Sequence, residues 1–280
     1  MLSLVLLAGL AAWHWQPPVP DELIPPGGTP RLVDAWPRLA SRVLVNPGFL
    51  LGYSEWRGGP LWVAYALNPE PAHDLPPRPR GFRGDDRVWN GLRPGGLKGS
   101  GYDRGHLAPN YAIARHHGRE AQRATFRLSN IVPQRPALNQ LIWQRLEEAE
   151  SDRVAPRLAR LWVIAGPIHD PRAGRGAPPV AFFRIWWATD GRRWRALAFR
   201  VPQSVCGGEL PSAFLTTVDA LERETGLDFA PALDAAEAEG IEARVDAEAW
   251  PLAAVDDLPL RYAGRFDLSA CKDTGFQPAS

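Results

Sequence analysis

Cysteine is scarce in this sequence, which has 280 residues and only two cysteines, Cys206 and Cys271. Two thiolates cannot form a four-ligand zinc site by themselves, so a zinc module built from cysteine alone is excluded. In an exported protein an even number of cysteines favours one disulfide, and two buried free thiols are the alternative. The sequence contains no internal repeat, and its length suffices for one large domain or two small ones.

The apolar run at the N-terminus of the sequence is also too short to span a membrane comfortably. This run, Met1–Trp15, is shorter than the about 20 residues that cross a bilayer, and no basic region precedes it. We expect residues 1–16 to act as a signal peptide or a membrane anchor, with a buried helix as the alternative. Proline and glycine are frequent in residues 17–38, which predicts a linker, and residues 39–280 are expected to form the folded domain.

A large excess of one charge is missing as well, because 32 Lys and Arg face 31 Asp and Glu. This balance excludes a chain that coats nucleic acid with uniform positive charge. The charges are unevenly distributed: residues 70–160 hold 16 basic and 10 acidic side chains, whereas residues 221–280 hold 5 and 13. The basic excess indicates a surface for a polyanion, and a mixed surface with no partner is the alternative.

The sequence Gly-Tyr-Asp-Arg-Gly-His-Leu-Ala-Pro-Asn (101–110) gathers several groups suited to catalysis. His106 can take a proton near neutral pH, and the planar guanidinium of Arg104 can donate to two phosphate oxygens. Gly105 allows a sharp turn or close approach to a ligand, and Pro109 disfavours regular structure, so we expect His106 on a short irregular segment. Alternatively, the acid and the arginine pair on the surface and the histidine packs under a loop.

A second group of candidates follows about thirty positions later. Residues 126–134 are typical of a strand running into a turn, and a helix is predicted from about residue 138 to about residue 152. Asn139 and Glu147 lie two turns apart on this helix and only about 80° apart around its axis, so they can face one pocket. An amide oxygen suits Mg²⁺, and a carboxylate can hydrogen-bond the waters that Mg²⁺ retains.

These segments together resemble the DNA/RNA non-specific endonuclease family, a group of ββα-metal nucleases that includes endonuclease G and the Serratia-type nucleases. The resemblance extends from about Arg42 to about Leu233. It is carried by four motifs: Asp-Arg-Gly-His-Leu-Ala-Pro (103–109), Leu-Ser-Asn-Ile-Val-Pro-Gln (128–134), Leu-Asn-Gln (138–140), and Trp143 with Leu146-Glu147. It implies a metal-dependent endonuclease that cleaves DNA and RNA with little sequence preference and leaves 5′-phosphate and 3′-hydroxyl ends.

The resemblance also implies roles for individual residues. His106 would be the general base, Asn139 would hold Mg²⁺, for which Mn²⁺ could substitute, and Glu147 would orient metal-bound water. Arg104 would brace the phosphate. A second phosphate-binding arginine is expected in the loop before Phe82, with Arg78 preferred over Arg80.

Other functional expectations are less closely tied to the motifs. Arg135 and Arg145 are further candidates for substrate binding. The adjacent histidines His116 and His117 invite a metal site, but no third ligand has suitable spacing, so we predict a surface turn. If His106 is the base, activity should rise with pH near its ordinary pKa of about 6.5, shifted by the charge of Arg104.

The remaining patterns complete the expected fold, which is α+β with a central, mostly antiparallel sheet flanked by helices. Strands are predicted at 60–67, 160–168, 180–189 and 193–201, with a hairpin at Asp190-Gly191, and an amphipathic helix at 212–225. The expected partners are DNA and RNA as substrates, a second copy of the chain in a homodimer, and a membrane if the N-terminus is an anchor. The expected location is periplasmic, secreted or anchored. A binding protein of this fold that does not cut, and a zinc enzyme, are the alternative functions.

Overall fold

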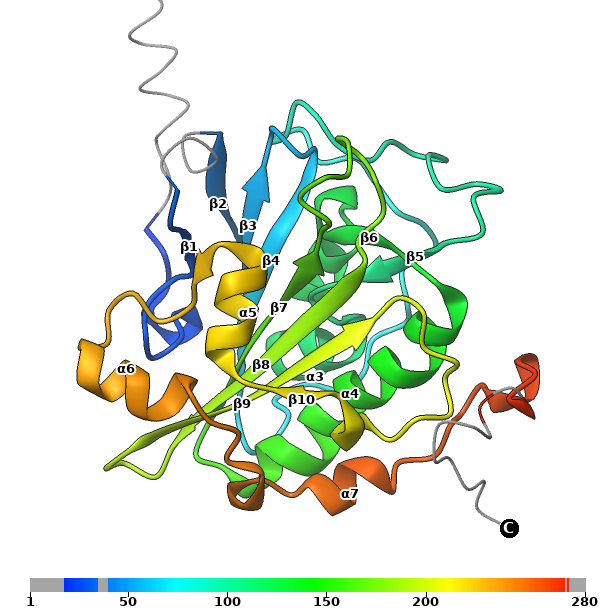
Figure 1. Ribbon diagram of the computed structural model, residues 1–280. Helices are drawn as coiled ribbons and strands as arrows, with labels where there is room; N and C mark the ends of the chain where they lie inside the picture. Colours follow the sequence, from blue (N-terminus) through cyan, green and yellow to red (C-terminus); the bar gives the residue numbers. More distant parts are fainter. Residues whose placement is uncertain (1–17, 35–39, 270, 272–280) are drawn as a thin grey trace, which may run out of the picture.

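The computed structural model describes residues 18–34, 40–269 and 271. A seven-stranded antiparallel sheet forms the centre of the molecule, in the order β10-β9-β8-β7-β4-β3-β2 (Figure 1). The predicted central antiparallel sheet is therefore confirmed. Its strands are β2 (Ser41–Asn46), β3 (Phe49–Ser54), β4 (Gly59–Leu67), β7 (Leu161–Ile168), β8 (Ala181–Thr189), β9 (Trp194–Pro202) and β10 (Leu215–Thr216).

Both faces of the sheet are covered, which explains the continuous apolar sequences of its inner strands. In β8 successive side chains point to opposite faces. Phe182 and Trp186 belong to one hydrophobic core, whereas Phe183, Ile185 and Trp187 belong to the other. The hairpin between β8 and β9 turns at Asp190-Gly191 as predicted, with Gly191 at a φ of 88°.

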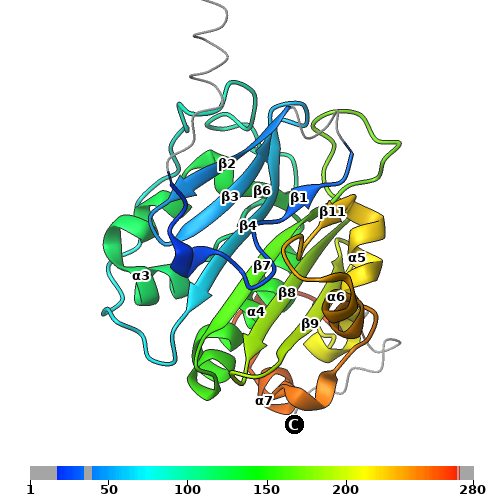
Figure 2. The ribbon, with the colours of Figure 1, turned by 90° about the vertical axis from the view of Figure 1, so that its left-hand side faces the viewer.

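Helices form a layer on each side of this sheet (Figures 1 and 2). On one side of the sheet, the hydrophobic core contains side chains from α3 (Asn110–Thr125) and from a long helix that runs from residue 138 to residue 157. The central part of this long helix is α4 (Gln144–Ala149). The opposite core contains Val218 and Leu221 of α5 (Val218–Thr225). Two further helices follow α5, namely α6 (Ala235–Glu242) and α7 (Leu252–Asp256).

The ββα element consists of a small separate sheet and the long helix. Strands β5 (Asp103–His106) and β6 (Ile131–Gln134) pair antiparallel, so that His106 lies opposite Ile131. The long helix begins with a π-helical turn at Leu138–Trp143, continues as α4, has a second π-helical turn at Glu150–Val154 and ends with a 3₁₀ turn at Ala155–Arg157. The helix predicted from residue 138 is confirmed, with irregular turns that residue spacing does not reveal.

Two expectations for the ββα element are wrong: the irregular segment at His106, and the strand that runs into a turn over residues 126–134, where the turn comes before the strand. His106 lies on a regular strand instead of an irregular segment, because Pro109 acts later, as the N-cap of α3. Gly105 admits a close neighbour, but that neighbour is Gln134, whose side chain would overlap a Cβ at this position. Residues 128–130 form a 3₁₀ turn before β6 because the side chain of Asn130 donates to the backbone oxygens of Ala108 and Thr125.

The surface turn predicted for His116 and His117 is also wrong, since both residues lie within α3. His116 is buried and its Nε2 is 3.2 Å from the Oγ of Ser151, while Nε2 of His117 is 2.7 Å from the backbone oxygen of Ala66. The helix is kinked at Gly118, where φ is 82°. The two rings therefore tie α3 to different neighbours and do not meet at one ion.

The predicted helix at 212–225 is shorter than expected. A 3₁₀ turn covers Pro211–Phe214, β10 pairs with the edge of the sheet, and α5 starts only after Thr217, whose Oγ1 accepts from the backbone nitrogen of Ala220. The end of α5 at Gly226 agrees with the prediction, because this glycine caps the helix with a φ of 68°. A hydroxyl N-cap had more influence than the apolar pattern on where the helix begins.

The two cysteines form a disulfide, Cys206–Cys271, with a Cα–Cα distance of 5.7 Å. Residue 206 follows β9, and residue 271, which lies 65 positions further along the chain, is close to the C-terminus. The pairing expected from the even cysteine count is therefore present. For a loop of this length the chain-entropy account gives a contribution of about 4 kcal/mol.

The N-terminal expectations are only partly covered by the structure. The predicted signal or anchor at 1–16 lies outside the described residues. Within the predicted linker, the described residues 18–34 pack on the domain: Leu23 is buried and β1 (Arg31–Leu32) pairs with β11 (Leu227–Asp228). This part of the segment is therefore attached to the domain at Leu23 and at β1. No helix in residues 18–34, 40–269 or 271 is long and apolar enough to cross a membrane.

Candidate active site

A cleft of about 440 Å³ opens beside the ββα element, between β5, the long helix and a C-terminal segment. Five residues singled out in the sequence line it, although they come from three separate parts of the chain. These residues are Arg78, Arg104, His106, Asn139 and Glu147. The fold thus brings the two motifs into one polar site, here called the cleft.

His106 lies in an aromatic frame at the end of β5. Its ring centroid is 5.0 Å from that of Phe126 and 5.4 Å from that of Phe82. Its Nε2 is buried and has no hydrogen-bond partner in the described protein. Burial, with a further contribution from the positive charge of Arg78, lowers the pKa of His106 to about 3. The imidazole is therefore neutral at physiological pH, and one nitrogen remains available to a ligand.

The predicted pH dependence is changed by this environment. We expected the imidazole to titrate near its ordinary pKa of about 6.5, with Arg104 as the neighbouring charge. Burial is the main cause of the lowered pKa of His106, and the charge that adds to it comes from Arg78. An apolar frame cannot be inferred from the residues that adjoin His106 in the sequence, because Phe82 and Phe126 are distant from it along the chain.

Two arginines flank the histidine by stacking on the same aromatic frame. The guanidinium of Arg104 lies 4.9 Å from the ring centroid of Phe82, and that of Arg78 lies 5.1 Å from the ring centroid of Phe126. Cation–π stacking restrains the planes of these guanidinium groups, and no hydrogen bond or ion pair with the described residues occupies their donors, which suit a phosphate. The choice of Arg78 over Arg80 agrees with the cleft, which Arg78 lines and Arg80 does not.

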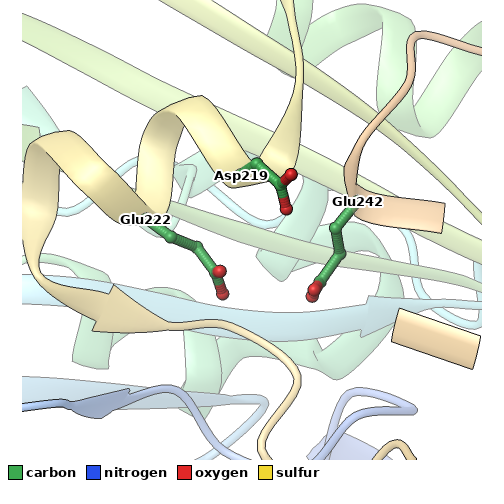
Figure 3. A group of neighbouring side chains, drawn as sticks. All are labelled: Asp219, Glu222 and Glu242. Atoms are coloured by element: carbon green, nitrogen blue, oxygen red, sulfur yellow. The ribbon is translucent and has the colours of Figure 1, made fainter. Parts of the chain in front are cut away.

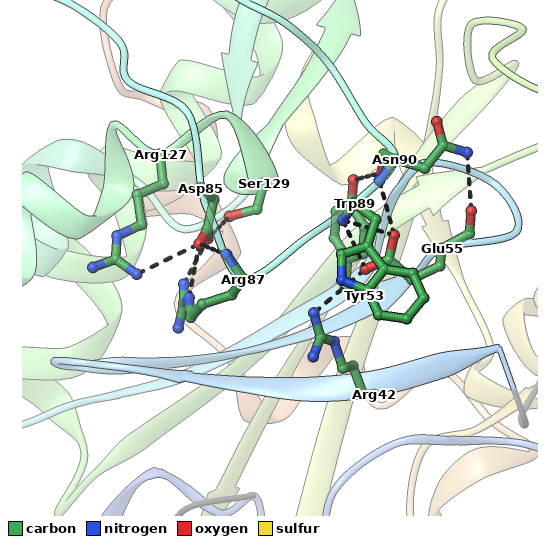
Figure 4. A network of polar contacts seen from close by, with 9 residues as sticks. All are labelled: Arg42, Tyr53, Glu55, Asp85, Arg87, Trp89, Asn90, Arg127 and Ser129. Atoms are coloured by element: carbon green, nitrogen blue, oxygen red, sulfur yellow. Dashed lines mark hydrogen bonds and ion pairs between the residues drawn. The ribbon is translucent and has the colours of Figure 1, made fainter. Parts of the chain in front are cut away.

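The long loop that carries Arg78 and Phe82 is fastened to the body of the protein through Asp85 (Figure 4). This buried carboxylate forms an ion pair with Arg87 at 2.6 Å, accepts from the Oγ of Ser129 at 2.6 Å, and lies 3.8 Å from Arg127. Burial alone would raise the pKa of Asp85, but the hydrogen bonds from Arg87 and Ser129 and the charge of Arg87 bring it to about 2. The carboxylate is therefore ionised and fixes the loop next to the ββα element.

A second anchor holds the same loop closer to the sheet (Figure 4). Glu55 accepts from the backbone nitrogens of Trp89 and Asn90 and forms an ion pair with Arg42 at 3.4 Å. The hydroxyl of Tyr53 donates to the backbone oxygen of Asn90 at 2.5 Å. These contacts give the loop a defined path although it has no helix and no strand of its own between β4 and β5.

Asn139 is oriented by a carboxylate from the neighbouring strand. The Oδ2 of Asp103 accepts from Nδ2 of Asn139 at 2.9 Å and from Nε2 of Gln140 at 2.8 Å. Because an ionised carboxylate can only accept, it selects the amide nitrogen of Asn139 and leaves Oδ1 available to a ligand. Asp103 therefore positions the amide oxygen that the sequence suggested as a metal ligand.

Glu147 is joined to the central sheet by a buried arginine. Its Oε1 lies 3.6 Å from the guanidinium of Arg184, which forms a second ion pair with Glu150 at 2.8 Å. Tyr65 and Trp186 also donate to Glu150, at 2.6 Å and 2.7 Å. Burial raises the pKa of Glu147 to about 8, against the opposing effect of the Arg184 charge. Arg184 thus sets the position of Glu147 from the sheet below.

The oxygens around Asn139 suit a hydrated Mg²⁺ ion. Buried oxygens of Asn110, Gln144 and Glu147 have no hydrogen-bond partner within the described protein, and all three residues line the cleft. Mg²⁺ is typically held by few protein ligands and keeps several waters, which need acceptors of this kind. One amide ligand at Asn139 with surrounding acceptors for water therefore fits this ion.

Comparison with known proteins identifies the family. The profile of the DNA/RNA non-specific endonuclease family matches residues 37–236. The chain belongs to this family. A nuclease from Nostoc sp. is 29% identical to it over 219 residues, covering 73% of this chain and 78% of the Nostoc protein. Mitochondrial endonuclease G of Bos taurus is 30% identical over 254 residues, covering 82% and 83%.

Comparison with solved structures shows the same fold. A chain in the crystal structure of the EndoG/EndoGI complex superposes with a TM-score of 0.62 at 23% identity, covering 70% of this chain and 88% of that one. Mitochondrial endonuclease G of Homo sapiens is 32% identical over 204 residues, covering 65% of this chain and 67% of the human protein. The family and the fold suggested by the four sequence motifs are thus confirmed.

Two predicted substrate-binding residues of this endonuclease family member lie elsewhere. Arg145 is buried and donates to the backbone oxygens of Glu209 and Asp256, so the prediction that it contacts substrate is wrong. Its guanidinium is bound to the segments that carry Glu209 and Asp256, and the residue is not part of the cleft lining. Arg135 is exposed and lies in a separate depression beside Tyr102 and Phe266.

Several cleft residues were not identified in the sequence. Asn110 directly follows the histidine motif, and Gln144 lies three positions before Glu147 on the same helix, so residue spacing could have indicated both. Tyr262 and Arg265 also line the cleft, although they come from the acidic C-terminal region. Nothing local in the sequence marks these two residues, because the disulfide and the fold of the C-terminal segment bring them there.

Proposed function

We propose that this protein is a Mg²⁺-dependent endonuclease that hydrolyses phosphodiester bonds in DNA and RNA without sequence preference. The observation that carries the proposal is the buried, neutral His106 in one cleft with the oriented amide oxygen of Asn139. A protein that only binds nucleic acid has no need for a base with an unpartnered nitrogen beside a metal-ligating group. Family membership supports the same reaction class.

His106 acts as the general base in the proposed reaction. Its Nε2 accepts a proton from the attacking water, and the aromatic frame of Phe82 and Phe126 holds the ring in place. The lowered pKa of His106 keeps the ring neutral before substrate arrives. A bound phosphate brings negative charge close to the ring, which raises this pKa and makes the imidazole a stronger base when it is needed.

Asn139 supplies the protein ligand for Mg²⁺ through Oδ1, with Asp103 holding the amide. When bound, Mg²⁺ stabilises negative charge on a phosphate oxygen and on the leaving 3′ oxygen. Glu147, Asn110 and Gln144, whose buried oxygens have no hydrogen-bond partner in the described protein, would accept hydrogen bonds from water on the ion. The pKa of Glu147 is raised to about 8 even with the opposing charge of Arg184 beside it, so its carboxylate form would be favoured further by the positive charge of a bound Mg²⁺.

Arg104 and Arg78 stabilise the phosphate as negative charge builds on it. Both guanidinium groups line the cleft and stack on aromatic rings, so their directions are restrained before substrate binds. A backbone phosphate is common to DNA and RNA and is independent of base identity. Recognition centred on it therefore accounts for activity on both polymers without sequence preference.

The experiment that tests the proposal is cleavage of supercoiled plasmid and of single-stranded RNA by the purified protein. We expect both to be cut in the presence of Mg²⁺ or Mn²⁺ and neither to be cut with excess chelator. Binding of DNA without cleavage in any divalent ion would identify the chain as a nucleic-acid-binding member of the fold.

The location of the protein is part of the same proposal. The disulfide between Cys206 and Cys271 supports export to an oxidising compartment, either the periplasm or the exterior. Assembly as a homodimer and anchoring through residues 1–16 stay predictions from the sequence.

A further inference from the structure

Three carboxylates come together on the face of the protein opposite the helix layer that holds Asn139 and Glu147. Asp219 and Glu222 lie one turn apart on α5, and Glu242 is the last residue of α6. Figure 3 shows the three side chains pointing toward a common space between the two helices. One oxygen from each lies within 4.8 Å of the others. Two oxygens bound to one Ca²⁺ at 2.3–2.6 Å can be separated by up to about 5 Å, so the three atoms can share an ion.

The burial of Glu242 distinguishes this group from an ordinary acidic patch. The residue is only 7% exposed, and its Oε1 is buried with no hydrogen-bond partner in the described protein. A buried carboxylate oxygen without a donor is costly unless something satisfies it. Glu242 points toward Asp219 and Glu222, so a ligand placed among the three would supply the missing partner.

The surrounding charges are also unfavourable without a cation. The neighbours that act on Glu242 by charge are Glu222, Asp219 and Asp228, all of them acidic. Glu242 also lies at the C-terminal end of α6, where the helix dipole favours a positive group. Glu222 has one hydrogen bond of its own, from the backbone nitrogen of Phe229 at 2.8 Å, which leaves its second oxygen for an ion.

We propose that Asp219, Glu222 and Glu242 bind one Ca²⁺ ion, which joins the end of α6 to α5. Ca²⁺ takes six to eight oxygen ligands in flexible geometry, so three carboxylates and a few waters suffice. Mg²⁺ fits less well, since it requires nearly ideal octahedral geometry and gives up its waters reluctantly. The site is structural, because it is formed by helices on the other side of the central sheet from the cleft. It is separate from the metal proposed for catalysis.

Thermal unfolding of the whole protein with and without Ca²⁺ tests the site. For dissociation constants of about 10⁻⁴ to 10⁻³ M, about 10 mM Ca²⁺ should raise the Tm by about 3–10 °C after removal of metal by chelator. In Glu242→Gln this shift should disappear, whereas the Tm without metal should be equal to or above that of the wild type, because one of several mutually repelling carboxylates is gone. Plasmid cleavage in Mg²⁺ should be unchanged.

Three further variants make the result specific. Glu239→Gln changes the same charge at an exposed position of α6 and should keep the full Ca²⁺ shift. Asn139→Ala should also keep it, which separates this site from the cleft. Asp219→Asn removes a ligand from the less buried side and should lose the shift even if Glu242→Gln fails to fold. A Ca²⁺ shift of the same size in Asp219→Asn and the wild type, or none in the wild type, would overturn the proposal.

Discussion

The cleft and the carboxylate group of α5 and α6 are two oxygen-rich sites with opposite electrostatics. The lining of the cleft combines the neutral amide of Asn139 and the neutral ring of His106 with three arginines and two glutamates, which are Arg78, Arg104, Arg265, Glu147 and Glu148. In the second site three carboxylates meet without a basic group among the neighbours that act on Glu242. The first arrangement favours an anionic substrate and a loosely held, hydrated ion. The second arrangement favours a cation that remains bound.

This difference indicates what each site can do. A metal that takes part in hydrolysis must keep positions open for water and phosphate, so a single protein ligand supported by hydrogen-bond acceptors is adequate. A metal that joins two helices needs protein ligands from both, and charge is useful because no substrate has to enter. The following predictions test whether the chemistry of the cleft depends on the groups assigned to it.

The largest expected effect is that of His106→Ala. Removing the proposed base should lower the rate of plasmid nicking by about 10²- to 10⁴-fold, while affinity for Mn²⁺ and for DNA is retained. The matched control is His117→Ala, which removes a ring bonded to the backbone of Ala66 outside the cleft. This control should change stability but not the activity of the folded protein. A folded His106→Ala protein as active as the wild type would refute the assignment of the base.

The second effect concerns the metal ligand and the residue that orients it. Asn139→Ala should weaken Mn²⁺ binding at the cleft by more than the about 10- to 100-fold expected for Asp103→Asn, since loss of an orienting partner is less severe than loss of a ligand. Calorimetric titration in a Glu242→Gln background would observe the cleft alone. Equal affinity in all three proteins would show that the ion binds elsewhere.

The smallest effect is on the dependence of activity on pH. The pKa of His106, lowered to about 3, leaves the ring neutral throughout the working range, so the imidazole should produce no change near pH 6.5. The pKa of Glu147, raised to about 8, means that the carboxylate is lost as pH falls below that value, and activity should fall with it. Added Mg²⁺ should shift this fall in activity to lower pH, because it favours the ionised form of Glu147.

The check on this prediction is the pH profile of kcat/KM for the wild type and for Glu147→Gln. The variant should be slower but nearly flat between about pH 6 and pH 9, because the titrating group is gone. An unchanged acidic limb in Glu147→Gln would mean that another group controls it.

Much of the fold could be predicted because its strands carry strong local signals. The β-rich sequence of β4 and the hairpin at Asp190-Gly191 each specify structure over a few residues. Errors occurred where a side chain bonds to the backbone. Asn130 turns the chain before β6, and Thr217 delays the start of α5. Each of these hydrogen bonds involves the side chain of one residue and does not alter hydrophobic periodicity. Periodicity therefore does not predict them.

The candidate site was predictable in its residue types and less so in its environment. Helical spacing predicted that Asn139 and Glu147 face one pocket, the family resemblance added His106, and all three line the cleft. The shift in the pKa of His106 depends on Phe82 and Phe126, and the position of Glu147 depends on Arg184, which lies on a strand of the central sheet. These neighbours come from distant parts of the chain, and only the fold brings them together.

The disulfide has a consequence for when the protein becomes a finished enzyme. It retains the C-terminal segment that brings Tyr262 and Arg265 to the rim of the cleft. With the thiols reduced, that segment is held on the long helix mainly by exposed contacts, such as Arg261 with Glu148 and Arg265 with Gln140, which contribute little. One wall of the cleft is therefore secured only after oxidation.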